Sequence, residues 1–135
     1  MRVMLDTNIL ISALVFRSKQ MNEIIRLLAQ EHSLVLCSYV IDELHEVVRL
    51  KFSDKKYAIE EFLLALPFEF IYTPHELPQH EFFEIRDKDD EKVLYSAILA
   101  DVDILISGDK DFEEIKIGKP EILKPVEYIR KYGRL

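Results

Sequence analysis

Short apolar runs alternate along the chain with stretches in which apolar residues recur at helical spacing. The runs predict five buried strands, at residues 2–5, 34–37, 68–72, 103–107 and 121–124. The helical spacing predicts helices over 8–15, from 21 onward, and over 39–51, 55–66, 93–100 and 126–132, with one short turn at 110–114. Because strands alternate with helices, we predict an α/β fold: a three-layer α/β/α sandwich on a five-stranded parallel sheet.

Local signals indicate where several helices should begin. Ser38 is a good N-cap for the helix after the second strand, and Asp89 or Asp90 should cap the helix over 93–100. Pro125 suits the first turn of the closing helix. No repeat, low-complexity tract or linker interrupts the chain, so residues 1–135 are predicted to form a single domain.

The composition is globular, with 49% of residues hydrophobic and 32% charged. No apolar stretch approaches the roughly 20 residues of a membrane span, and no signal segment opens the chain, so we expect a cytoplasmic protein with no membrane association. Cys37 is the single cysteine, which excludes an intrachain disulfide and a cysteine zinc cluster. It lies in an apolar run and is predicted to be a core residue.

The net charge of −7 argues against a protein that coats nucleic acid, because such proteins neutralise phosphates with a basic face. Nucleic acid remains open as a substrate, since bound divalent cations reverse the local sign of an acidic site. Such a site requires a few of the acidic side chains to lie close together in the fold.

Four carboxylates are expected at one edge of the sheet. Asp6 and Asp109 follow apolar strands, Glu43 lies early in the helix after the second strand, and Asp90 opens a helix that starts near the same edge. In open α/β sheets, ligands bind outside the carboxyl ends of the strands, where the strand order reverses. Carboxylates gathered there repel one another unless a cation compensates, and Mg²⁺ or Mn²⁺ prefers such oxygen ligands.

Each acid also has an ordinary structural interpretation. Asp6 before Thr-Asn can be a helix cap, and a glutamate such as Glu43 is usually solvated. The charge run 87–90 can be a surface turn, and Asp109 and Asp111 can cap the next turn. Convergence on one edge favours the functional interpretation. No serine–histidine or cysteine–histidine arrangement and no glycine-rich phosphate loop competes with it.

The acid motifs resemble those of a known family. The stretch 1–10 with Asp6, the mid-chain Glu43, the run 86–92 and the stretch 106–112 resemble the PIN domain, and are most similar to small prokaryotic single-domain VapC-like toxins of toxin–antitoxin pairs. The resemblance implies strand order 3-2-1-4-5 and a metal-dependent ribonuclease. Its catalytic, metal-binding quartet would be Asp6, Glu43, Asp90 and Asp109.

The resemblance extends to residues around the quartet. It implies Asp111 as an accessory metal ligand, with Asn8 and Ser107 steadying the site. One or two Mg²⁺ or Mn²⁺ ions would activate a water that cuts RNA to leave a 3′-hydroxyl and a 5′-phosphate. The candidate RNA contacts, which can equally be solvated surface charges, are Arg86, Lys88, Lys92 and Lys110.

The resemblance also implies partners: an RNA substrate, a small antitoxin protein and a second copy of the chain in a homodimer. Apolar residues in 55–72 and at Phe82–Phe83 could pack in the core or against a partner. Two alternatives remain open, namely a catalytically inactive PIN-like module that binds RNA or protein, and a housekeeping RNA-processing nuclease. A response-regulator receiver would need an aspartate ending the third strand, and a haloacid-dehalogenase phosphatase would need an acid where Asn8 stands.

Overall fold

The computed structural model of the chain describes residues 1–75, 88–113 and 115–134. Its strands are β1 (Arg2–Leu5), β2 (Ser33–Cys37), β3 (Phe68–Ile71), β4 (Ile104–Ile106) and β5 (Glu121–Leu123). Its helices are α1 (Thr7–Val15), α2 (Lys19–Gln30), α3 (Ser38–Lys51), α4 (Lys56–Ala65), α5 (Lys88–Leu99) and α6 (Pro125–Tyr132), with short 3₁₀ helices η1 (Ser53–Lys55) and η2 (Lys110–Phe112).

The five strands form one parallel sheet in the order β3-β2-β1-β4-β5. β1 lies at the centre, where Val3 pairs with Leu34 of β2 on one side and with Ile104 of β4 on the other. Beyond their first residues, Arg2 and Ser33, β1 and β2 are apolar, as is β4, because helices cover both faces of the sheet. The predicted fold class and strand order are confirmed.

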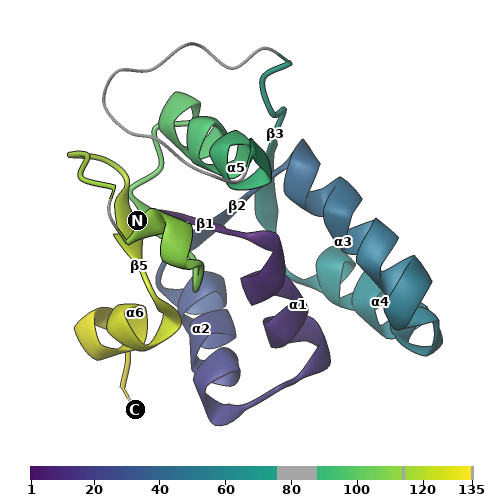
Figure 1. The fold of residues 1–135 in the computed structure, drawn as a ribbon. Helices are drawn as coiled ribbons and strands as arrows, with labels where there is room; N and C mark the ends of the chain where they lie inside the picture. The colour runs from purple at the N-terminus through teal and green to yellow at the C-terminus, as the bar shows by residue number, and fades with distance from the viewer. Residues whose placement is uncertain (76–87, 114, 135) are drawn as a thin grey trace.

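The hand of the strand connections decides which face each helix covers. Parallel strands joined through a helix form right-handed crossovers almost without exception. The step from β1 to β2 and the step from β3 to β4 run in opposite directions across the sheet. The connecting helices must therefore lie on opposite faces, and Figure 1 shows α5 on one side of β1 with α1 and α2 on the other.

Two predicted helix caps are wrong. Ser38 is the first residue of α3 rather than its N-cap; Cys37 occupies the cap position, and the Ser38 hydroxyl instead accepts a hydrogen bond from the Thr73 N–H. Asp89 and Asp90 do not cap a helix either, because α5 already begins at Lys88 and both acids lie in its first turn. The positive end of the helix dipole favours acids throughout that turn, so the described part of the charged run, residues 88–92, forms helix instead of a polar turn.

The apolar segment 55–72 is only partly used in the core. Ile59 and Leu66 are buried, whereas Tyr57, Leu64 and Tyr72 are exposed. Phe82–Phe83 lie outside the described residues. Cys37 is buried, as predicted. Within the described part of the chain, no helix has the length and apolar character needed to cross a membrane.

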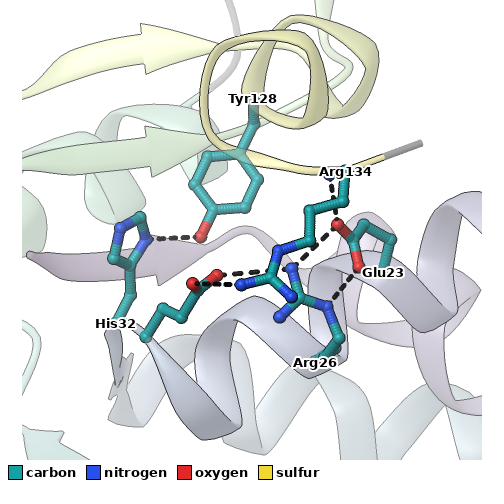
Figure 2. Close-up of polar contacts among 6 residues, drawn as sticks. Glu23, Arg26, His32, Tyr128 and Arg134 are labelled. Carbon is teal, nitrogen blue, oxygen red and sulfur yellow. Dashed lines mark hydrogen bonds and ion pairs between the residues drawn. The ribbon is translucent and has the colours of Figure 1, made fainter.

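The C-terminal helix is fastened to α2 by polar contacts (Figure 2). The Tyr128 hydroxyl lies 2.7 Å from Nδ1 of His32, just beyond α2. Glu23, buried on α2, accepts hydrogen bonds from the Arg26 guanidinium at 2.5 and 3.0 Å and from the backbone N–H of Arg134 at 2.6 Å. One carboxylate thus ties the end of the chain to the body of the protein.

Glu23→Gln should destabilise the protein at neutral pH and not in acid. The hydrogen bond from Arg26, and then that from the Arg134 N–H, lower the pKa of Glu23 to about 2. A lowered pKa stabilises the fold above the unfolded-state value of about 4.3, and this contribution is lost as pH falls toward 2. Urea unfolding from pH 7 to pH 2 should show a wild-type advantage that disappears across that window. Glu61→Gln, at an exposed position of α4, is the control, and a pH-independent difference would contradict the interpretation.

Candidate functional site

Asp6 lies directly after the central strand and performs two structural tasks. Its Oδ1 accepts a hydrogen bond from the Ile9 N–H at 2.9 Å, which makes Asp6 the N-cap of α1. Its Oδ2 accepts a short hydrogen bond from the Ser107 hydroxyl. The side chain is only 6% exposed. The cap interpretation of Asp6 is therefore correct, and it fixes the carboxylate where β1 meets β4.

Hydrogen bonds from backbone N–H groups to side-chain oxygens shape the loop after β4. The Asp109 N–H donates to Ser107 Oγ at 3.1 Å, and the Asp111 N–H donates to Asp109 Oδ1 at 2.9 Å. Asp109 is thereby the N-cap of η2. The Ser107 N–H donates in turn to the Leu123 carbonyl at 3.0 Å, so β5 supports the same loop from the other side.

Three carboxylates come together at this loop. Asp90, Asp109 and Asp111 each offer one oxygen, and these oxygens all lie within 4.8 Å of one another. Asp90 is supplied by the first turn of α5, across the sheet edge from the η2 loop. The structure therefore places Asp111, expected only as an accessory, on the same footing as Asp90 and Asp109.

Asp6 and Glu43 lie outside that three-residue group, and Asp6 feels the charges of both Asp109 and Glu43. Burial raises the pKa of the Asp6 carboxyl above its usual range. Hydrogen bonds from Ser107 and the Ile9 N–H lower it, while the negative charges of Asp109 and Glu43 raise it further. Asp109 thus links the two sets of acids, and all four acids of the predicted quartet converge on one edge of the sheet.

The structure gives fewer contacts for Asn8 and for the candidate RNA-binding residues. Asn8 is exposed in the first turn of α1, and Lys88 and Lys110 are exposed near the acids in the chain. The ammonium of Lys92 lies 5.0 Å from the centre of the Tyr39 ring and 3.5 Å from Asp89, so it is already engaged within the protein. Arg86 lies outside the described residues.

The donor set fits a hard divalent cation. Carboxylate oxygens are the preferred ligands of Mg²⁺. One oxygen from each of Asp90, Asp109 and Asp111 lies within 4.8 Å of the other two, so the three are near enough to share one such ion. The charges of Asp6 and Glu43 add to the negative potential that attracts the cation.

Sequence reasoning missed the neighbours of Glu43. The Tyr39 hydroxyl donates to Glu43 Oε2 at 2.6 Å, and the Tyr39 N–H donates to Thr73 Oγ1 at 3.1 Å. Burial, followed by the hydrogen bond to Glu43, raises the pKa of Tyr39, so this hydroxyl stays a donor at ordinary pH. The spacing of four residues on a helix signals the first contact. Nothing in the sequence signals the contact with Thr73, which comes from another element.

A hollow of about 530 Å³ lies at the edge of the sheet opposite the acids. Its lining includes Arg2, Ser33 and Phe68, which stand where β1, β2 and β3 begin. Its charged groups are already satisfied, because the Arg2 guanidinium donates to Glu69 at 2.6 Å and to the Ala100 carbonyl at 2.5 Å. Ligands of open α/β sheets bind at the other edge, so we assign no function to this hollow.

The fold and the site define a class of protein. It is an α/β protein with a parallel sheet of strand order 3-2-1-4-5 and carboxylates at the carboxyl ends of the neighbouring strands β1 and β4. The sequence profile of the PIN domain matches residues 2–111, and the chain belongs to that family. The resemblance found in the sequence is therefore confirmed.

A solved structure with the same fold is that of VapBC2 from Rickettsia felis, bound to a DNA fragment from their promoter. It matches with a TM-score of 0.65 and 20% identity over 92% of this chain and 98% of that chain. At this identity the likeness concerns the fold alone. A comparison with curated proteins gives no match.

Asp6→Asn should stabilise the metal-free protein. A raised pKa means that ionised Asp6 is less favourable in the folded than in the unfolded chain, and this penalty grows as pH rises above about 3.9. Asparagine can still accept from the Ile9 N–H while removing the buried charge. In EDTA at pH 7 we expect a higher melting temperature; a gain of about 1 kcal/mol would raise it by about 4 °C.

The exposed Asp54→Asn serves as the matched control for this measurement and should melt with the wild type. The gain of Asp6→Asn should shrink as pH is lowered toward 4, where the wild-type carboxyl takes up its proton. A lower melting temperature at neutral pH would show that the carboxylate stabilises the fold.

Proposed function

We propose that this protein is a divalent-metal-dependent endoribonuclease and the toxin component of a toxin–antitoxin pair. The observation that carries the proposal is the convergence of acids at the β1–β4 edge. Asp90, Asp109 and Asp111 lie within reach of one cation, and the charges of Asp109 and Glu43 act on Asp6. Such packing of like charges is costly, and a bound cation would offset the cost.

The residues would divide the work in the following way. Asp90, Asp109 and Asp111 would hold Mg²⁺ or Mn²⁺, with Asp6 and Glu43 completing the negative surface around it. When bound, such an ion lowers the pKa of a coordinated water and stabilises charge on a phosphate. Ser107 would hold the Asp6 carboxylate beside the η2 loop, because its hydroxyl donates to Asp6 and accepts from the backbone N–H of Asp109.

RNA as the substrate is proposed from the family resemblance, with products ending in a 3′-hydroxyl and a 5′-phosphate. Lys88 and Lys110 are exposed beside the acids in the chain and are available for phosphate contacts. Lys92 is a weaker candidate because it is engaged by Tyr39 and Asp89.

Protein partners are supported by exposed apolar side chains. Tyr57, Leu64, Phe70 and Tyr72 are between 44% and 88% exposed, and apolar surface of this kind often marks an interaction site. The similar structure contains VapBC2, which supports a VapC-like role for this chain. We propose a small antitoxin and a second copy of the chain as partners. The single domain over residues 1–135 and the cytoplasmic location remain predictions from the sequence.

Purified protein should cut single-stranded RNA with Mn²⁺ or Mg²⁺ and lose this activity in EDTA. Loss of a residue that only supports a metal site typically costs about 10- to 100-fold. Asp6→Asn and Asp109→Asn should each reduce the cleavage rate by more than this. Asp54→Asn should cleave at the wild-type rate. Cleavage that persists in EDTA and in both site variants would exclude the proposed mechanism.

Expression of the chain alone should arrest growth, and co-expression of a small protein encoded next to it should relieve the arrest. Asp109→Asn, expressed at the same level, should be harmless. Growth without arrest, together with metal-dependent cleavage in vitro, would favour a housekeeping nuclease. Absence of both activities would favour a module that binds without cutting.

A further inference from the structure

Polar contacts join three elements beside the acidic edge: the end of β3, the first turn of α3 and the middle of α5. The Thr73 N–H donates to Ser38 Oγ at 2.9 Å, and the Tyr39 N–H donates to Thr73 Oγ1 at 3.1 Å. The hydroxyl of Ser96 lies 3.1 Å from the same Thr73 oxygen. Thr73 therefore connects the backbone at the start of α3 to both β3 and α5.

The side chain of Tyr39 is held along its length. Its ring faces the Lys92 ammonium at 5.0 Å, and Lys92 in turn lies 3.5 Å from Asp89. Its hydroxyl donates to Glu43 Oε2 at 2.6 Å. A tyrosine–glutamate pair four residues apart is ordinary on a helix surface. Here the tyrosine is fixed from outside the helix, by Thr73 at its backbone and by Lys92 at its ring.

We propose that Tyr39 is the positioning residue for Glu43 in the proposed metal-dependent reaction. Its hydrogen bond to Oε2 restricts the orientation of the carboxylate, whose charge already acts on Asp6, and would leave Oε1 as the oxygen for the cation. A free glutamate has several rotatable bonds and would sample many orientations, most of them facing solvent. Partners that hold metal-binding carboxylates are typically worth 10- to 100-fold in metal affinity or activity. The inference rests on the proposed function, because it gives Glu43 a cation to meet.

Tyr39→Phe tests the hydrogen bond while keeping the ring that faces Lys92. Calorimetric titration with Mn²⁺ should show binding about 10- to 100-fold weaker than in the wild type. The Mn²⁺ concentration for half-maximal RNA cleavage should rise by the same factor, while the rate at saturating Mn²⁺ recovers. The melting temperature in EDTA should be unchanged. Tyr132→Phe, at a tyrosine of α6 that has no part in the proposed site, should match the wild type in all three measurements.

A double-mutant cycle with Glu43→Gln shows whether Tyr39 acts through Glu43. Once Glu43→Gln has removed the charge, adding Tyr39→Phe should weaken Mn²⁺ binding no further. Independent, additive losses would overturn the proposal, and so would wild-type Mn²⁺ affinity in Tyr39→Phe; in both cases the nuclease proposal would stand. A wild-type protein that neither binds Mn²⁺ nor cuts RNA would overturn both proposals.

Thr73→Val provides a second approach if Tyr39→Phe lowers the melting temperature. It removes the oxygen that accepts from the Tyr39 N–H and leaves the Tyr39 hydroxyl in place. Its Mn²⁺ binding should weaken in the same direction, by a smaller factor. Wild-type affinity in Thr73→Val would then overturn the proposal that Tyr39 must be fixed for Glu43 to bind the cation.

Discussion

Mutual repulsion among carboxylates is the constraint on which the rest of this structure depends. Asp6 is buried and lies within the field of Asp109 and Glu43, so the folded chain must hold these groups against their own charge. It does so with donors from the chain itself. The Ile9 N–H and the Ser107 hydroxyl hold Asp6, and the Asp111 N–H holds Asp109. The Asp6 and Asp109 carboxylates are therefore held by the chain itself, so the proposed cation would require little reorganisation of these two groups.

The sheet topology explains why these donors are available at one place. The strand order reverses beside β1, so the connections after β1 and β4 leave toward opposite sides. The first turns of α1 and η2 then begin next to each other, each with unsatisfied backbone N–H groups that an aspartate can cap. Helix capping and the proposed metal binding thus call for the same residue type at the same edge, and Asp6 and Asp109 are the two caps found there.

Much of the candidate site was predictable because local sequence patterns determine where its acids lie. Asp6 and Asp109 follow apolar strands, and parallel strands bring their carboxyl ends to one edge, so the convergence follows from the chain order. The two wrong caps have a local cause: one residue decides whether Ser38 or Cys37 occupies the cap, and acids stabilise the first turn of α5 as readily as a cap.

The contacts of Tyr39 were not predictable in the same way. Thr73 and Lys92 reach Tyr39, and Ser96 reaches Thr73, only because β3 and α5 fold against the start of α3. No spacing in the sequence records such a tertiary arrangement. The proximity of Asp111 to Asp90 was not predictable for a related reason, since it depends on how the η2 loop meets the first turn of α5.

The Ser107–Leu123 hydrogen bond shows that the family profile and the physical unit have different boundaries. The PIN match ends at residue 111, yet β5 accepts the N–H of Ser107 and covers the open edge of β4. A chain shortened to the matched region would leave β4 as an unprotected edge strand, a template for aggregation. It would also release the serine that organises Asp6 and Asp109. The acids of the proposed site all precede residue 112, but β5, the strand that supports their loop, lies beyond it.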